Sequence, residues 1–501
     1  MTTKQQLIDW LVTSTTRRVV LVEIEGVLDS TGTSIGNQYF SNKPYGTTST
    51  DTPANILYQA CINGGVTFSE TLDLDGRASL GFGDIQLDNT DGSRDSLLTW
   101  IWVNKPVKVY IGDASWPKAD FYQIFSGFVA DIDSKNRNSI NIILVDKLQQ
   151  LNVAVTETLI GGTGTTKDQL NPLCFGECFN VTPVVLNSST LTYQVHNGTI
   201  DEIIEVRDNG AVVAFETATI SGVPQGTFNL LATPFGTITA SVRGAKPDGI
   251  NFSAKIGSII NNLLQNYGKT VNAVDIDTTN FNNFDSTASS QADVGVYLQN
   301  RENVLDVCQR LASSVGGYLT TGIDGKFKLV QLKVDLQEGS QTYSVGPQDM
   351  EERSLTISQK VPVQGAIKLG YSKNWTVQTS GLASGLLPGV VSVFSKDYNI
   401  VYSKNTTVLT RYAQSAEPVL KETLLLTTAK AEDEATRLLN IYSTPRFIYS
   451  ANYYPHMLLC ELGDIMKITN SRFGLSNGKI GTIVKIDRDW LRGRVNIGVF
   501  V

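Results

Sequence analysis

The chain has 501 residues, of which 41% are hydrophobic and 18% are charged, and its formal net charge is −7. This length suggests three or four domains of about 100–200 residues each, and a chain so apolar and so lightly charged is not generally disordered. The sequence contains no stripe of Lys and Arg that could neutralise a phosphate backbone, which argues against tight nucleic-acid binding.

The lack of a recognisable targeting signal and the cysteine usage predict a protein made in a cytoplasm. No apolar run approaches the roughly 20 residues that a bilayer-spanning helix needs, and the N-terminus lacks the apolar core of a signal peptide. The cysteines are odd in number and scattered, which is typical of a reduced compartment and not of a disulfide scaffold. They are Cys61, Cys174, Cys178, Cys308 and Cys460.

Residues 1–160 are predicted to form an N-terminal antiparallel β-barrel. Apolar residues from Leu7 to Val12 recur at helical spacing and predict a helix over 4–14. The stretch 29–65 is rich in turn signals and is predicted to be loop. Evenly spaced strands with turns between them are typical of a barrel or sandwich. Strands are predicted at 18–28, 66–76, 78–89, 105–113, 121–133 and 139–148.

Two smaller domains are predicted in the middle of the chain. The Gly- and Thr-rich residues 161–171 are typical of a linker. Residues 172–245 then form a small inserted β domain, in which the Asp-Asn-Gly sequence at 208–210 predicts a tight hairpin. Residues 246–345 form an α+β domain, with apolar stripes that predict helices. Its elements are helices at 253–267 and 302–315 and a hairpin at 316–332.

Residues 346–501 are predicted to form a C-terminal β-barrel domain. A Gly- and Ser-rich loop insertion at 379–389 and one helix at 427–443 interrupt its strands. The predicted fold class is therefore mainly β with some α+β, in a multidomain chain with two antiparallel β-barrels.

Two distant stretches of the sequence, 127–145 and 481–501, are alike. Each follows a short apolar strand, at 107–111 and 464–468. Common origin would give the chain two related β-barrels, whereas a chance likeness of two amphipathic hairpins is the alternative. The matched pairs are Gly127 and Gly481, Val129 and Ile483, Ile132 and Ile486, Asp133 and Asp487, and then, after one extra residue, Ile140 and Val495, Asn141 and Asn496, Ile142 and Ile497, Leu144 and Val499.

Four stretches of the sequence, at 104–133, 173–210, 301–329 and 459–486, have a recognisable pattern of strands and turns. Through these stretches the chain resembles the baseplate-hub or tail-tip proteins of long-tailed bacteriophages, a siphophage-like tail protein family. The resemblance is one of pattern and includes no catalytic signature.

The resemblance implies a homotrimeric hub in the virion tail tip. Two β-barrel domains per chain would form a ring of pseudo-six-fold symmetry. The implied partners are the distal tail protein of the tube, the C-terminus of the tape-measure protein and a central fibre or tip protein. The hub would close the tube until DNA ejection, and DNA would pass through its lumen without tight binding.

The sequence offers few residues for catalysis. His196 and His456 are the only histidines, and neither lies beside a catalytic motif. No Gly-x-Ser-x-Gly sequence is present, and Gly161–Thr166 lacks the spacing of a phosphate-binding loop. We therefore expect no enzyme activity, no catalytic residue and no cofactor.

Cys174 and Cys178 are the sharpest candidates for a metal or redox site. Zinc and iron–sulfur sites need about four ligands and commonly use two-residue spacing between paired cysteines, whereas these two are separated by three residues. A cluster completed by Cys308 and Cys460 remains an alternative. We expect the cysteines to be small buried hydrophobic residues and predict no metal site.

Other charged and aromatic groups have structural interpretations. Asp84, Asp88 and Asp91 fit turns between strands, the 131–138 stretch does not complete a calcium loop, and 432–434 is predicted to be a solvated helix face. A dense aromatic group favours a core or subunit interface over glycan contact. It comprises Trp100, Trp102, Tyr110, Trp116, Phe121, Tyr122 and Phe125.

Two alternatives to the hub remain at this stage. One is a receptor-binding or carbohydrate-binding tail protein, which the aromatic group could serve. The other is a tail-associated cell-wall hydrolase, which would need paired carboxylates in one cleft.

Overall fold

The structure is a computed structural model of the full chain and describes residues 3–13, 17–74, 80–162, 164–247, 249–269, 271–334, 336–415 and 417–501. It divides into two compact units built from discontinuous segments. Unit 1 comprises Met1–Gln149, Thr320–Val361 and Arg446–Val501, and unit 2 comprises Gln150–Leu319 and Pro362–Pro445. The four-domain division expected from the sequence stays a prediction. In the described part, no helix is both long and apolar enough to cross a membrane.

Unit 1 is dominated by one sheet of 15 strands. Helix α1 (Lys4–Val12) begins at a capping box, in which the Thr3 side chain accepts from the Gln6 backbone and the Gln6 side chain accepts from the Thr3 N–H. The strands of the N-terminal part are β1 (Arg18–Leu28), β2 (Ser34–Ser41), β3 (Tyr45–Gly46), β4 (Leu57–Ala60), β5 (Ile62–Thr71), β6 (Phe82–Asp88), β7 (Pro106–Asp113), β8 (Tyr122–Asn136) and β9 (Ser139–Asp146). The later strands are β21 (Tyr343–Val345), β22 (Thr356–Val361), β26 (Arg446–Tyr453), β27 (Ile465–Ile468), β28 (Lys479–Asp489) and β29 (Arg494–Phe500).

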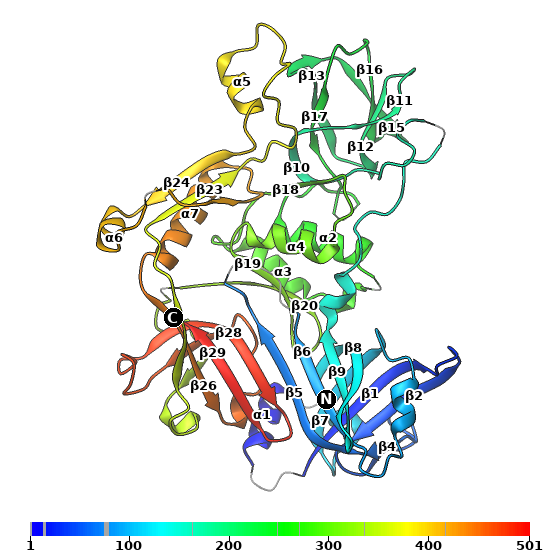
Figure 1. The fold of residues 1–501 in the computed structure, drawn as a ribbon, viewed down its shortest axis with the longest axis vertical. Helices are drawn as coiled ribbons and strands as arrows, with labels where there is room; N and C mark the ends of the chain where they lie inside the picture. The colour runs from blue at the N-terminus through cyan, green and yellow to red at the C-terminus, as the bar shows by residue number, and fades with distance from the viewer. Residues whose placement is uncertain are drawn as a thin grey trace. The chain divides into compact units, whose positions relative to one another are not determined.

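The sheet brings the two ends of the chain together. Its main order is β22-β26-β29-β28-β5-β6-β9-β8-β7-β1-β2-β4-β3, with β27 against β28 and β21 against β27. Figure 1 shows the red strands β28 and β29 next to the blue strands β5 and β6. Short 3₁₀ turns connect the strands: η1 (Asp95–Thr99), η2 (Lys118–Asp120), η3 (Lys147–Leu151), η5 (Pro347–Asp349) and η6 (Pro455–Met457).

The same five-strand arrangement occurs twice in this sheet. The first copy is β5-β6-β9-β8-β7 and the second copy is β22-β26-β29-β28-β27. The hairpins have the same register, since Val129 faces Leu144 where Ile483 faces Val499. The register shifts one residue later in both, which leaves Ala130 and Val484 as bulge residues.

The flanking strands keep the same correspondence. Val107 faces Gly127 in the first copy, and Met466 faces Gly481 in the second. On the other side of the hairpin, Phe82 faces Val145 and Ile448 faces Phe500. The two copies share one bulge and the register of four strands. Amphipathic alternation alone does not require this agreement, which therefore favours a duplication of the five-strand arrangement over a chance likeness.

The prediction of two separate β-barrels is wrong, as the sheet order shows. The described strands form no closed barrel, and both copies belong to one open sheet. The reason lies in β5, whose outer edge pairs with β28 of the second copy instead of closing the first copy on itself. The sequence could predict the strands of each hairpin, but it could not predict which edges would meet.

Unit 2 contains three sheets and most of the helices. Its sheet orders are β14-β13-β17-β10-β18, β11-β12-β16-β15 and β24-β23-β25. The first two use β10 (Leu173–Val181), β11 (Val184–Asn187), β12 (Thr192–Thr199), β13 (Glu202–Asp208), β14 (Ala211–Val213), β15 (Phe215–Ile220), β16 (Val223–Leu230), β17 (Ile238–Arg243) and β18 (Gly295–Leu298). The third uses β23 (Ala366–Tyr371), β24 (Asn399–Lys404) and β25 (Leu420–Glu422).

The helices of unit 2 include three that pack close together, α2, α3 and α4 (Figure 1). The α-helices are α2 (Ile256–Tyr267), α3 (Thr278–Ser286), α4 (Val304–Ser313), α5 (Pro388–Phe394), α6 (Thr406–Arg411) and α7 (Thr428–Tyr442), and η4 (Ala273–Asp275) is a 3₁₀ turn. Strands β19 (Gly317–Thr321) and β20 (Phe327–Gln331) follow α4 in the chain. A turn at Gly322–Lys326 separates them, where the sequence predicts it.

Several local predictions are confirmed and others are wrong. The strand predicted at 18–28 is β1, and Asn209 and Gly210 form the two-residue turn between β13 and β14 with positive φ angles. The predicted loop at 29–65 instead contains β2, β3, β4 and the start of β5. Parts of four predicted elements lie outside the described residues: residue 14 of the helix, residues 75–76 and 78–79 of two strands, and Thr163 of the linker.

Candidate functional site

The strongest candidate for a functional feature is the β5–β28 junction, where the two copies meet. Residues 485–489 of β28 pair antiparallel with residues 67–71 of β5. Across this ladder the Ser69 hydroxyl donates a hydrogen bond to Oδ1 of Asp487. The backbone ladder therefore makes one continuous surface out of segments that lie more than 400 residues apart.

Arg488 is a buried residue of the junction. It is only 3% exposed, and its guanidinium donates hydrogen bonds to the carbonyls of Leu458 and Cys460. It also forms an ion pair with Glu70 of β5, with 2.9 Å between Nη1 and Oε2. A buried guanidinium with paired donors holds its partners in one geometry, so Arg488 fixes β5 against β28.

Asp146 is a second buried charged group in the first copy. Its carboxylate accepts hydrogen bonds from the backbone N–H of Gly81, at 2.7 Å, and of Leu148, at 2.9 Å. Burial raises the pKa of Asp146 to about 7, with the negative charge of Glu70 acting in the same direction. The carboxyl group therefore titrates near neutral pH.

The sequence analysis missed Arg488, Glu70 and Asp146. A signal for Arg488 was present, because strand alternation places it on the same side as Ile486 and Trp490, both of which are buried. A charged residue at an inward position of a strand is expected to have a partner. No comparable pattern in the sequence identifies Glu70 as that partner, since the pairing depends on the sheet order.

A shallow groove of about 560 Å³ crosses the junction. Its lining mixes acidic, basic and amide side chains with two phenylalanines, and burial raises the pKa of Asp84 in it. Such a surface suits contact with another macromolecule better than capture of a small apolar ligand. It is lined by Thr67, Phe68, Ser69, Phe82, Gly83, Asp84, Lys135, Ile143, Asn452, Asp487, Arg488, Asp489, Arg494 and Asn496.

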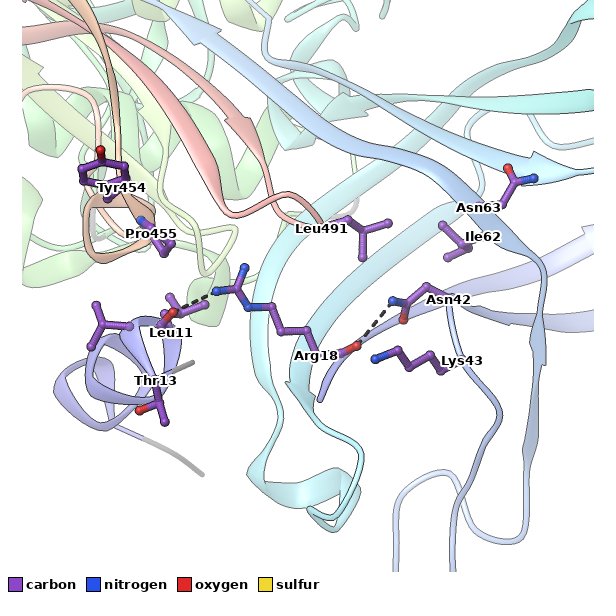
Figure 2. A pocket seen from close by; sticks show the side chains of 11 residues that line it. Leu11, Thr13, Arg18, Asn42, Lys43, Ile62, Asn63, Tyr454, Pro455 and Leu491 are labelled. Atoms are coloured by element: carbon purple, nitrogen blue, oxygen red, sulfur yellow. Dashed lines mark hydrogen bonds between the residues drawn. The ribbon is translucent and has the colours of Figure 1, made fainter. Parts of the chain in front are cut away.

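An open depression of about 770 Å³ lies at the end of α1 in unit 1. Figure 2 shows Arg18 reaching toward α1, where Nη2 donates to the Leu11 carbonyl at 2.8 Å, and Asn42 donating to the Arg18 carbonyl. Burial lowers the pKa of Arg18. Arg18 therefore connects β1 to α1, and its role is structural. Among the described residues that line it, there is no carboxylate and no histidine that could act as a general base.

Cys174 and Cys178 lie on β10 and are packed in the core between two sheets of unit 2. Both are buried and unoxidised, and they contact apolar residues such as Val195, Phe228 and Val242. Burial, followed by the neighbouring Cys174, raises the pKa of Cys178. A thiolate, the form that binds metals, is disfavoured there. Within the described residues, no group of three His, Cys, Asp or Glu side chains is placed to hold a metal ion.

The other two cysteines considered for a cluster are also buried. Cys308 lies on the apolar face of α4, and burial raises its pKa. Cys460 follows η6, and burial raises its pKa to about 12.

The two histidines have structural partners. Nδ1 of His196 accepts the backbone N–H of Cys174 at 3.0 Å, and burial lowers the pKa of His196 to about 4. The contact is to the Cys174 backbone and not to its thiol, so it does not activate a nucleophile. His456 lies 3.3 Å from a carboxylate oxygen of Asp349 at the surface of unit 1.

The aromatic group quoted from the sequence lies mainly in the interior of unit 1. Trp102 and Phe121 are 1% and 2% exposed, and Phe125 stacks on Phe68 with 4.5 Å between ring centroids. Trp100 stacks on Trp102 with 5.9 Å between ring centroids. Trp102, Phe121 and Phe125 therefore belong to the core. None of the seven rings is fully exposed, and the other four are half-buried: Trp100, Tyr110, Trp116 and Tyr122.

The acidic clusters follow their predicted interpretations only in part. Asp84 lies within strand β6, where it faces Thr67 and Ile143, and not in a turn as predicted. Asp88 and Asp91 accept hydrogen bonds from Thr90 and Ser93 in a turn. Residues 432–434 are not a wholly solvated helix face, because Glu434 is buried on α7. Its carboxylate pairs with Arg437 at 2.6 Å, which makes the burial possible.

Comparisons with known proteins find resemblance in structure only. No family model and no curated protein matches the sequence. The chain is similar to the 43 kDa tail protein of prophage MuSo2 from Shewanella oneidensis, with 11% identity, a TM-score of 0.40, and coverage of 97% of this chain and 98% of that chain. It is similar to the tail protein from Neisseria meningitidis MC58, with 8% identity, a TM-score of 0.41, and coverage of 97% and 96%.

A third similar structure is prophage tail protein gp18 from Listeria monocytogenes EGD-e, with 8% identity, a TM-score of 0.36, and coverage of 96% of this chain and 94% of that chain. The chain is thus similar to phage tail proteins, the class that the sequence pattern resembles. All three TM-scores lie below 0.5.

Proposed function

We propose that the chain is a structural component of a bacteriophage tail tip or baseplate. In this proposal it forms a homotrimeric hub that joins the six-fold tail tube to a three-fold central fibre or tip. Its neighbours in the virion would be the distal tail protein, the tape-measure protein C-terminus and the fibre or tip protein. The hub would keep the tube closed until DNA ejection.

The observation that carries the proposal is the duplicated five-strand arrangement in unit 1. The two copies share strand order, register and a bulge at the same position. Three chains in a closed ring would present six such copies on one side while keeping three-fold symmetry elsewhere. A chain of this kind can match a six-fold partner at one end and a three-fold partner at the other.

His196 and Asp146 give no support to a cell-wall hydrolase. Such an enzyme needs an acid and a base or nucleophile in one accessible cleft. His196 is buried against a backbone N–H, and Asp146 is buried at the end of strand β9, where its carboxylate accepts two backbone N–H groups. These interactions stabilise the fold, and a mechanical role uses no reactive group.

The test is the mass and shape of the purified full chain. Light scattering would give the number of chains, and negative-stain class averages would give the outline. We expect three chains in a ring with a lumen. A monomer, or a lobed spike without a lumen, would contradict the hub. Imaging of the chain between tube and fibre in the virion would then establish its place.

A further inference from the structure

Residues 131–135 of β8 form an exposed strand edge in the first copy. The equivalent residues of the second copy, 485–489 of β28, pair with β5. In the first copy, β7 and the residue before it pair with β8 only as far as Val129, and no described strand continues along that side. One backbone group of this segment, the Ile132 N–H, donates to Oδ1 of Asp131. Unpaired backbone groups along a strand edge are a template for another strand.

Strand β22 is the matching unused edge in the second copy. Its counterpart β5 pairs on both sides, with β6 and β28, whereas β22 pairs only with β26 and ends the sheet. Residues 356–360 are exposed, and Ile357 presents 39% of its surface. Each copy therefore contributes one edge to the internal junction and leaves its other edge open.

We propose that β22 of one chain pairs with residues 131–135 of β8 in a second copy of this chain. The contact would repeat between chains the β5–β28 junction that already exists within one chain. It deepens the proposed function and rests on it, because it identifies the interface through which the homotrimeric hub closes.

The internal junction predicts the register of this contact. Ser69 of β5 faces Phe82 on one side and Asp487 on the other. In the second copy Ile448 takes the place of Phe82, and Gln359 faces it. Gln359 of one chain should therefore face Asp133, the equivalent of Asp487, in the next chain. Lys360 would then face Ile132.

Side-chain chemistry at these positions is complementary. In the internal junction the Ser69 hydroxyl donates to Asp487, and in the predicted contact the Gln359 amide can donate to Asp133 in the same way. Strand β22 carries Lys360 as its single charged residue, whereas the β8 edge begins with the carboxylates of Asp131 and Asp133. Lys135 lies on the same β8 edge, so antiparallel pairing of two β8 edges centred on Asp133 would place two carboxylates opposite each other but would also place Asp131 opposite Lys135. Strand β22 carries no carboxylate, so pairing two β22 edges would leave Gln359 without an acceptor of this kind. Pairing of unlike edges is therefore the arrangement that repeats the contact between Ser69 and Asp487.

Pairing of unlike edges is head-to-tail, which produces either a closed ring or an open filament. A ring built this way would alternate the internal β5–β28 junction with the β22–β8 contact between chains. The two junctions use equivalent strands, so each step around the ring would turn by a similar angle. Closure after three chains is what the proposed hub requires.

Cysteine cross-linking of the full chain tests the contact. The double variant Asp133→Cys/Gln359→Cys places one thiol on each edge, and Ser69→Cys/Asp487→Cys is the matched control inside one chain. Directly facing residues in antiparallel strands have Cα atoms about 4.5–5.5 Å apart, within the about 4.4–6.8 Å that a disulfide spans. The five native cysteines are buried, and the single variants measure any background from them.

After mild oxidation, we expect non-reducing gels to show most of the Asp133→Cys/Gln359→Cys protein as covalent species of two and three chains. The control should form its disulfide without changing the number of chains, as read by peptide mass mapping. Trimers by light scattering with a bonded control but no interchain bond would overturn the β22–β8 contact and leave the hub standing. Monomers without an interchain bond would overturn both. Bonded ladders that continue beyond three chains would support the contact and overturn the closed trimer.

Discussion

The two copies of the five-strand arrangement share their backbone and differ in their side chains. Both have a glycine where the hairpin needs close approach, since a Cβ on Gly127 would lie 2.3 Å from the Val145 carbonyl oxygen and one on Gly481 would lie 2.1 Å from that of Phe500. By contrast, the buried Arg488 of the second copy corresponds to the exposed Ser134 of the first.

This difference shows which features the fold requires and which the junction requires. The glycines and the bulge serve the hairpin, so both copies keep them. Arg488 serves the contact with β5, so only the copy whose edge is occupied within the chain has it. A strand edge that is already paired can bury a charge with its partner, whereas an open edge keeps polar residues in water.

The largest expected effect comes from Arg488→Ala. The substitution leaves Glu70 and two carbonyl groups without their partner in a buried site. Breaking one side of a buried ion pair typically costs about 3–5 kcal/mol, and urea unfolding monitored by fluorescence measures the loss. The matched control is Ser134→Ala, which removes a hydroxyl that donates to the carbonyls of Asn136 and Ser139 and should cost about 1 kcal/mol. Equal losses in the two variants would refute the distinction between a paired edge and an open one.

The two glycines should respond alike. Gly127→Ala and Gly481→Ala each force a methyl group against a backbone carbonyl, and overpacking of this kind costs about 1–3 kcal/mol. Gly46→Ala in β3 is the control, because its new Cβ would lie an ordinary 3.9 Å from the nearest atoms. The midpoints of thermal unfolding compare the three variants. A loss confined to one of the two hairpin glycines would contradict equivalence of the copies.

The sequence predicts the repeated hairpin, but it does not predict which strand pairs with the edge of each copy. The matches from Gly127 to Leu144 could be read along the chain, because strand alternation and turn residues are local signals. The pairing of β5 with β28 joins residues more than 400 positions apart, and no local pattern encodes it. The same limit applies to Asp146, whose partners come from the loop before β6 and from η3.

Asp146 offers a pH-dependent comparison with its counterpart, Val501. The two residues make the same backbone hydrogen bond in their copies: the Asp146 N–H donates to the Gly81 carbonyl, and the Val501 N–H donates to the Phe447 carbonyl. Because the folded state holds the pKa of Asp146 at about 7, above the ordinary value of about 3.9, the folded state binds more protons between these pH values. Stability should therefore fall as pH rises from 4 to 7, by at most about 1.4 kcal/mol per pH unit from this group.

The variant Asp146→Asn should remove this slope. We expect a loss of about 1 kcal/mol at pH 5, because the amide replaces one of two acceptors, and a flatter dependence of the unfolding free energy on pH. Urea unfolding at pH 5, 6, 7 and 8 gives the slope. An unchanged slope in the variant would assign the pH dependence to other groups.

The smallest expected effect is at Ser69, and it separates two views of the junction. Ser69→Ala removes the hydroxyl that donates to Asp487, on a side of the sheet that is open to water, so water can replace the lost donor. We expect a loss of about 0.5 kcal/mol in urea unfolding, smaller than that of Asn141→Ala, which removes a buried amide that donates to Asp133 at 3.1 Å in the first copy. A loss at Ser69 as large as that of Arg488→Ala would mean that exposed side-chain pairs hold the junction. A small loss would mean that the backbone ladder and the buried Arg488 guanidinium stabilise the β5–β28 junction. The open edges of β8 and β22 can form such a ladder, but neither of these described strands has a buried guanidinium. Association through those edges should then be weaker than the internal junction.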